Sequence, residues 1–181
     1  SLSDYGDFHF SLAHVLLESK EKEDSRYQEF FLEKSNSKNT VFLDNGAHEQ
    51  ELVSGEQLLE LGNSIQATHI ICPDSLGNYE ETVELTSKFL EIKSKFNNYN
   101  PKFIGVCQAK SWEEFVKLYK SYLENDKIDT IAIPYDLELF SIEELGESAA
   151  DMRQLEEKVS YRNMKTRIYA MNMLFSQNLL Q

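Results

Sequence analysis

Polar side chains recur where short apolar runs of this sequence end. Asp44 follows the run TVFL, Asp74 follows HIICP, and Gln108 follows FIGVC. Asp136 ends a fourth run, so these positions are 30, 34 and 28 residues apart. One strand, one turn and one helix together occupy about thirty residues in a β/α unit. We therefore expect these carboxylate and amide groups at one edge of a parallel sheet, where they could act as acids, bases or hydrogen-bonding groups.

The central stretch is Thr40 to Glu49, TVFLDNGAHE. It predicts a buried strand over 41–44 that ends on Asp44, followed by a turn that contains Gly46. Two further polar side chains of this stretch, Asn45 and His48, are expected near Asp44.

Strands and helices are expected to alternate along the chain. The apolar runs predict strands near 8–14, 41–44, 69–73, 103–107 and 130–134. Helical spacing of apolar residues predicts helices over 26–34, 51–63, 79–96, 111–124 and 160–177. The charged stretch 18–25 is interpreted as an exposed loop, and the acidic stretch 136–159 as a longer connection.

This alternation predicts an α/β protein with a parallel sheet. We expect the (β/α)8 TIM-barrel type, with its N-terminal five to six units present in one partial domain over residues 1–181. A complete barrel needs about 250 residues. The alternative is an open doubly wound sheet, in which some consecutive strands are not neighbours and helices cover both faces.

Composition and charge limit the environment and the partners. With 18 basic and 31 acidic residues the net charge is −13, so the whole-chain field repels phosphate, and nucleic acid would have to be held by a local basic patch or by another domain. The sequence has no apolar run long enough to cross a membrane and no leader pattern at its start, and the cytoplasm is the expected compartment.

Cys72 and Cys107 fall within predicted strands without metal-ligand spacing, so we expect no metal and no cofactor.

Each candidate also has a purely structural interpretation. Asp44 and Asp74 could cap the helices that follow their strands, and Gln108 could cap a loop. His14, at the expected end of the first strand, could be a site residue or a histidine satisfied by local hydrogen bonds.

Three motifs resemble the tRNA-guanine transglycosylase superfamily, and its shorter phage and DNA-modifying relatives in particular. They are LDNGAHE at 43–49, CPDSLG at 72–77 and GVCQAKSWEEF at 105–115. The resemblance covers roughly residues 8 to 140. It implies a (β/α)8 barrel that exchanges guanine in tRNA or DNA for a 7-deazaguanine base.

The resemblance also implies roles for individual residues. Asp44 matches the aspartate after the family's second strand and would act beside the ribose as the catalytic carboxylate. Asp74 would accept both donors of the guanine edge, N1–H and the amine, while the Gln108 amide would donate to O6. Ser75, Gly105 and Pro134 would line the same pocket, with His14, Asn45 and His48 near it. The target base would first have to leave its stack.

The sequence departs from the family in several places. Ala109 replaces a usual glycine, Ile133-Pro134 replaces a glycine-rich strand end, and the family's zinc motif of three cysteines and a histidine is not found. The nucleophilic aspartate of the family belongs to a later strand, so we expect this polypeptide to be inactive in base exchange. An unclosed barrel would be covered by a partner, by another copy of the chain or by further residues of the parent protein, and we favour the last.

Two rival functions remain open at this stage. The chain could be a non-catalytic barrel subunit that binds a base or nucleic acid, or an unrelated barrel enzyme that uses Asp44 and Asp74 as an acid/base pair.

Overall fold

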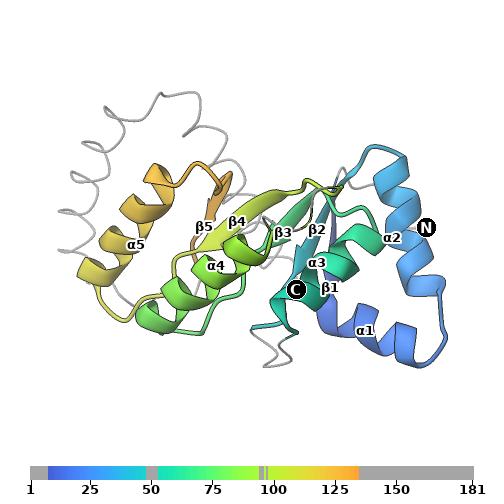
Figure 1. Cartoon of the computed structure of the whole chain (residues 1–181), viewed down its shortest axis with the longest axis horizontal. Helices are drawn as coiled ribbons and strands as arrows, with labels where there is room; N and C mark the ends of the chain where they lie inside the picture. Colours follow the sequence, from blue (N-terminus) through green and yellow to red (C-terminus); the bar gives the residue numbers. More distant parts are fainter. Residues whose placement is uncertain (1–7, 48–52, 94–95, 97, 135–181) are drawn as a thin grey trace.

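The computed structural model describes residues 8–47, 53–93, 96 and 98–134 (Figure 1). The strands within these ranges are β1 (Phe8–Leu12), β2 (Thr40–Asp44), β3 (His69–Ile71), β4 (Lys102–Val106) and β5 (Thr130–Ala132). The helices are α1 (Ala13–Glu21), α2 (Arg26–Asn36), α3 (Gly55–Ser64), α4 (Tyr79–Lys93) and α5 (Trp112–Glu124). The expected alternation of strands and helices is therefore confirmed over residues 8–134.

The five described strands form one parallel sheet in the order β1-β2-β3-β4-β5. The predicted α/β class with a parallel sheet is confirmed. Over these residues the sheet is open, as in the doubly wound alternative, while its strand order follows the chain, as in the barrel alternative. In either arrangement the carboxyl ends of all five strands lie at one edge, because the strands are parallel.

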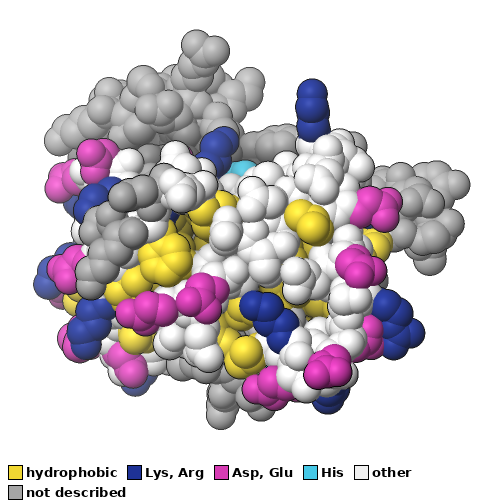
Figure 2. All heavy atoms as spheres, turned by 45° about the vertical axis from the view of Figure 1, so that its right-hand side comes forward, with side chains coloured by type: hydrophobic (Ala, Val, Ile, Leu, Met, Phe, Trp, Pro, Cys, Tyr) yellow, Lys and Arg dark blue, Asp and Glu magenta, His cyan; other side chains and the backbone are white. Residues whose placement is uncertain are grey.

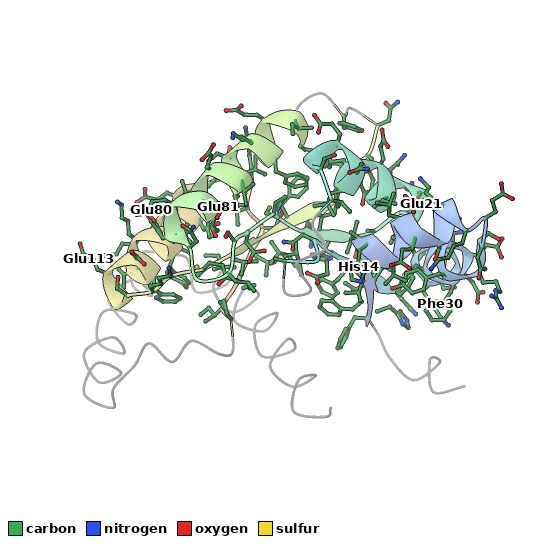
Figure 3. The ribbon with its side chains drawn as sticks, turned by 90° about the horizontal axis from the view of Figure 1, so that it is seen from below. His14, Glu21, Phe30, Glu80, Glu81 and Glu113 are labelled. Carbon is green, nitrogen blue, oxygen red and sulfur yellow. The ribbon has the colours of Figure 1, made fainter. Side chains whose placement is uncertain are left out.

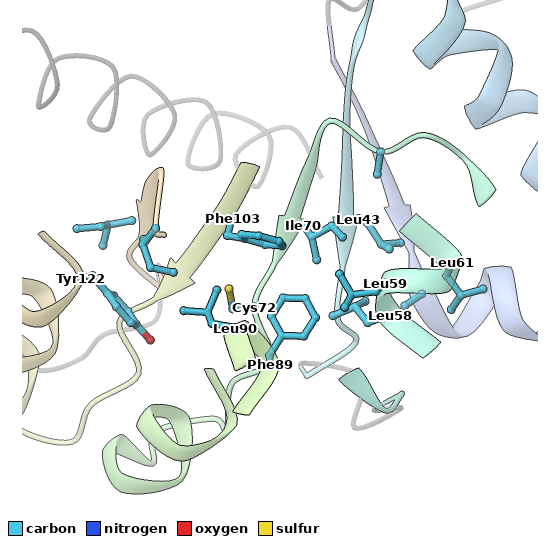
Figure 4. Packing of buried hydrophobic residues seen from close by; sticks show 14 of the residues in the cluster. Leu43, Leu58, Leu59, Leu61, Ile70, Cys72, Phe89, Leu90, Phe103 and Tyr122 are labelled. Atoms are coloured by element: carbon cyan, nitrogen blue, oxygen red, sulfur yellow. The ribbon is translucent and has the colours of Figure 1, made fainter. Parts of the chain in front are cut away.

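The main core lies between the sheet and the helices. Alternate strand residues face this core, including Val41 and Leu43 of β2 and Ile70 of β3. They pack against Leu58 and Leu59 of α3 and Phe89 of α4 (Figure 4). Apolar side chains of α1, α2 and α5 belong to the same cluster. All five described helices contribute to this one cluster, and they cover the same face of the sheet (Figure 3).

The opposite face of the sheet carries a second apolar cluster. Its buried members are Phe42, Ile71, Ile104, Val106 and Ala132. Phe8 and Phe10 pack against it from β1, and the Phe10 and Phe42 rings stack with their centroids 4.7 Å apart. A sheet with apolar side chains on both faces is typical of a parallel β/α protein.

The first element differs from the sequence prediction. The strand ends at Leu12 rather than near Ala13-His14, and helix α1 occupies part of the stretch expected to be a loop. Ala13 and Leu16 are buried and Leu17 packs beside them, so apolar positions here follow the spacing i, i+3, i+4. Because the largely apolar run FSLAHVLL contains no turn signal, the sequence did not indicate where the strand ends and the helix begins.

Side-chain caps fix where two other helices begin. Ser54 forms a capping box with Gln57, which starts α3 at Gly55 rather than near residue 51. Ser111 caps α5 by accepting a hydrogen bond from the Glu114 backbone N–H, as the S-x-x-E pattern predicts. The helix expected over 160–177 and the connection over 136–159 lie outside the described residues.

None of the helices in the described ranges is long and apolar enough to span a membrane.

Candidate functional site

Three buried polar side chains meet at the carboxyl edge of the sheet. Asp74 follows β3, Gln108 follows β4 and Asn45 follows β2. Gln108 Nε2 donates to Asp74 Oδ2 over 2.7 Å, and Asn45 Nδ2 donates to Asp74 Oδ1 over 2.6 Å. The exposed fractions are 2% for Asn45, 4% for Asp74 and 7% for Gln108. We call these three residues the strand-end cluster.

Asn45 holds the β2 turn against the end of β3. Its Nδ2 also donates to the Cys72 carbonyl over 2.7 Å, and its Oδ1 accepts from the Ala47 backbone N–H over 2.7 Å. Both N–H groups and the carbonyl oxygen of the Asn45 amide therefore form hydrogen bonds. Gly46 lies between these positions with φ +81°, a left-handed conformation that glycine adopts without strain.

Helix α4 fixes the backbone on either side of Asp74. Thr86 Oγ1 donates to the Pro73 carbonyl over 3.2 Å. Thr82 Oγ1 accepts from the Ser75 N–H over 3.0 Å and donates to the Ser75 carbonyl over 3.1 Å. Because both threonines are buried within a helix, they hold the Asp74 carboxylate in a defined position.

The loop after β3 reaches across to Gln108. The Gly77 backbone N–H donates to Gln108 Oε1 over 3.0 Å, and Gly77 has φ +58°. The Gln108 carbonyl is thereby occupied, which directs its amino group toward Asp74. The sequence contained this glycine in the turn SLGN, but its backbone N–H was not among the predicted site groups.

Burial raises the pKa of the Asp74 carboxyl, and the hydrogen bonds from Asn45 and Gln108 oppose this effect. Desolvation is the larger influence, because the carboxyl group is buried and has no cationic partner among the described residues.

The helix caps in the structure are different residues from those in the capping interpretation. Ser54 caps α3 and Ser111 caps α5. At the start of α4, Asn78 Oδ1 accepts from the Glu81 backbone N–H over 3.2 Å. Asp74 accepts hydrogen bonds from Asn45 and Gln108, and Gln108 Oε1 accepts one from the Gly77 backbone N–H, so Gln108 does cap the loop after β3.

Two other predicted site residues are chain neighbours of cluster residues. Asp44 ends β2 on the same face of the sheet as Phe42, and it is half-buried. Ser75 follows Asp74, but its Oγ donates to the exposed Glu81 over 2.7 Å and so points to the rim.

Gly105 has a packing role in the helix layer. A Cβ atom at this position would come within 2.8 Å of the Tyr122 ring of α5. Tyr122 also donates to the Val106 carbonyl over 3.4 Å, close to the end of β4. Because Gly105 has no side chain, the Tyr122 ring can pack directly against β4.

The remaining predicted residues do not join the strand-end cluster. His14 lies in the first turn of α1 on the β1 side of the sheet (Figure 3), and its buried Nδ1 has no hydrogen-bond partner within the described residues. Pro134 is half-buried two residues beyond β5. His48 and Asp136 lie outside the described residues.

Both cysteines are buried and free of disulfides. Burial raises the pKa of each thiol, so neither Cys72 nor Cys107 is a thiolate near neutral pH. Across residues 8–47, 53–93, 96 and 98–134, no group of three or more His, Cys, Asp or Glu side chains could hold a metal ion.

The fold and the site define a parallel α/β protein with a buried carboxylate-amide cluster at the carboxyl edge of its sheet. A scan against protein-family models gave no match, and neither did a search of curated protein sequences.

Proposed function

We propose that this chain is a transglycosylase-like protein that binds guanine or a 7-deazaguanine base at the strand-end cluster. The supporting observation is the close pair formed by Asp74 and Gln108 at the ends of neighbouring strands. We also propose that the sheet belongs to a barrel of the (β/α)8 type. The strand order along the chain and the placement of the five described helices on one face of the sheet support this assignment.

The unused hydrogen-bonding capacity of the pair fits a guanine edge. A carboxylate can accept about four hydrogen bonds, and Asp74 accepts two from described residues. The Gln108 amino group has two N–H bonds, of which one is directed to Asp74. Two acceptor positions and one donor therefore remain, and guanine offers two donors and one acceptor on its Watson-Crick edge.

Access sets a condition on binding. Asp74 and Gln108 are nearly buried, so a base must displace neighbouring loop atoms to reach them. The loop over 75–78 is the nearest element that could move, because its Gly77 N–H is joined directly to Gln108.

The proposed reaction is the exchange of guanine in nucleic acid for a 7-deazaguanine base, to which the strand-end cluster contributes recognition of the base. The nucleophile that would bond the sugar after guanine leaves, and give it up to the incoming base, is not among Asp44, Asp74 and Gln108. Asp44 lies at the end of β2, beside the cluster residue Asn45, which suits a carboxylate that acts next to the sugar. In this role Asp44 would orient the ribose or move a proton as positive charge develops on the sugar ring.

A specificity switch tests the base-binding proposal. Asp74→Asn replaces one acceptor by a donor, which suits xanthine, because xanthine has a carbonyl where guanine has its amine. We expect the wild type to bind guanine roughly tenfold to a hundredfold more tightly than xanthine, and the variant to reverse this order. Calorimetric titration with both bases, and with 7-deazaguanine, gives the affinities.

Asp24→Asn is the matched control, because it makes the same chemical change at a carboxylate that has no part in the cluster. It should leave both affinities unchanged. A reversal of preference cannot arise from partial unfolding, which weakens binding of both bases alike. If the wild type binds neither guanine nor 7-deazaguanine, the proposal is wrong and the cluster serves only to join three strand ends.

A further inference from the structure

A pocket lies at the amino edge of the sheet, opposite the edge that carries the strand-end cluster. It is bounded by the end of α4, the start of β4 and the loop between α5 and β5. Its volume is about 710 Å³, and it is partly open to solvent. Sites for small molecules typically have about 300–1,000 Å³. None of the described residues that the sequence predicted for the site lines this pocket.

One wall of the pocket is apolar. Leu90 and Phe103 are nearly buried members of the main core, and the half-buried Phe96 packs against the same core. Pro101 continues this wall at the start of β4. A flat ring can lie against such a surface without leaving polar groups unpaired.

Three lysines from three different segments line the same pocket. They are Lys93 at the end of α4, Lys102 at the start of β4 and Lys127 in the loop before β5. None of the three forms an ion pair within the described residues. Lys93 Nζ donates to the Phe96 carbonyl over 2.9 Å, which holds the ammonium group at the wall and leaves two of its N–H bonds for a ligand.

The two aspartates of the pocket do not cancel this charge. Asp129 Oδ2 accepts from the Phe103 backbone N–H over 3.0 Å, and Asp126 is exposed. His69 lies beside Lys102 in the sheet and reports the local field. Burial is the main reason that the pKa of His69 falls to about 4, and among the nearby charges Lys102 lowers it more than Asp129 raises it.

This group of lysines differs from the rest of the described surface. Lys22 and Lys88 each pair with a glutamate of their own helix region. On the face drawn in Figure 2, positive and negative side chains are interspersed without a continuous basic patch. Three lysines against two aspartates are therefore a local excess of positive charge in a chain with net charge −13.

We propose that this pocket binds a phosphate monoester that carries a flat ring, with about the size of a mononucleotide. The ring lies against the apolar wall and the phosphate faces the lysines. Lysine binds phosphate as a point charge, whereas the paired oxygens of a carboxylate are best matched by arginine, and no arginine is among the described lining residues. This second site does not depend on base binding at the strand-end cluster.

A ligand series tests both parts of the proposed ligand. Adenosine 5′-monophosphate is the probe, because adenine lacks the two donors and one acceptor that the strand-end cluster would recognise. Ribose 5-phosphate lacks the ring, and adenosine lacks the phosphate. In calorimetric titrations we expect the monophosphate to bind roughly tenfold more tightly than either, and its advantage over adenosine to shrink as salt rises.

A double variant and its matched control locate the site. Lys102→Gln combined with Lys127→Gln should weaken binding of the monophosphate roughly tenfold and leave adenosine unchanged. Lys20→Gln combined with Lys38→Gln changes the net charge equally at exposed lysines near α1 and α2, and it should bind as the wild type does. All four lysines are exposed, so both variants should fold as the wild type does.

The outcomes separate this site from the proposed function. Equal weakening in the two double variants, adenosine binding as tightly as its monophosphate, or no binding of the monophosphate overturns the inference. Displacement of the monophosphate by guanine also overturns it, because the two would then share the strand-end cluster. Binding of the monophosphate that depends on Lys102 and Lys127 supports the inference even if guanine does not bind.

Discussion

Gln108 donates a 2.7 Å hydrogen bond from Nε2 to Asp74 Oδ2, and this bond joins the ends of the neighbouring strands β4 and β3. Both side chains are nearly buried, so the bond is protected from competition with water. Asn45, at the end of β2, joins the same cluster by donating to the other carboxylate oxygen of Asp74, Oδ1. The cluster thus ties together three consecutive strand ends, and its contribution to stability can be measured separately from ligand binding.

Replacing Asn45 should strongly destabilise the fold. Asn45→Ala removes two donated hydrogen bonds and one accepted hydrogen bond, and it leaves one oxygen of a buried carboxylate without its donor. We expect a loss of about 2–4 kcal/mol in the free energy of unfolding. Urea denaturation of the variant measures this loss. The exposed Asn36→Ala is the control, with an expected change within about 0.5 kcal/mol; an equal loss in both variants would contradict the role of Asn45.

The raised pKa of Asp74 predicts a pH dependence of stability. Between the ordinary value of 3.8 and the raised folded-state pKa, the folded chain binds more protons than the unfolded chain. The contribution of Asp74 to the free energy of unfolding therefore increases as pH falls through this window and decreases as pH rises.

Comparison with Asp74→Asn isolates this contribution, because other carboxylates titrate in both proteins. Asp24, for example, has a pKa lowered to about 2 by its hydrogen bonds with Arg26, and it titrates with the opposite sign. The stability of the wild type relative to the variant should rise from pH 7 toward pH 4. A difference that is constant with pH, or that falls, would show that the Asp74 pKa is not raised.

Gly77 should be replaceable by asparagine at a lower cost than by alanine. Its φ of +58° is disfavoured for alanine, and we expect Gly77→Ala to lose about 1 kcal/mol in the free energy of unfolding. Asparagine tolerates this conformation better, so Gly77→Asn should lose less. Steric crowding does not determine which variant is more stable, because a Cβ atom at residue 77 would make only an ordinary contact with Lys110. Thermal unfolding of the two variants gives the order, and alanine equal to or better than asparagine would contradict it.

Gly105→Ala should destabilise the chain through Tyr122. The added Cβ would lie 2.8–3.0 Å from three ring atoms of this buried tyrosine. We expect a loss of about 1–3 kcal/mol in the free energy of unfolding, because the ring has to move within a packed core.

A double-mutant cycle shows whether Tyr122 is the cause. In the background of Tyr122→Leu, which removes the ring, the Gly105→Ala change should cost clearly less than in the wild type. Equal costs in both backgrounds would assign the effect to the backbone of β4.

Much of the fold could be predicted from the sequence because the signals are local. Apolar runs that end on polar residues located β2, β3, β4 and β5 to within two residues at each boundary. The serine caps also depend on neighbouring residues only, as Ser111 with Glu114 shows. At the first strand the local signal was ambiguous, because the run from Phe8 to Leu17 suits a strand or a helix.

The sequence predicted that Asp44, Asp74 and Gln108 converge, because they lie at successive strand ends. The structure brings Asp74 and Gln108 into direct contact. The sequence did not determine how Asn45 orients Asp74, because that bond joins residues 29 positions apart and needs the register of β2 against β3. Nor could it indicate that Gly105 faces Tyr122 rather than the cluster, since a glycine has no side chain to signal a face. Local pattern determined the elements and their polar ends. Only the tertiary structure decided which polar groups share hydrogen bonds, because strand register and the position of α4 set those distances.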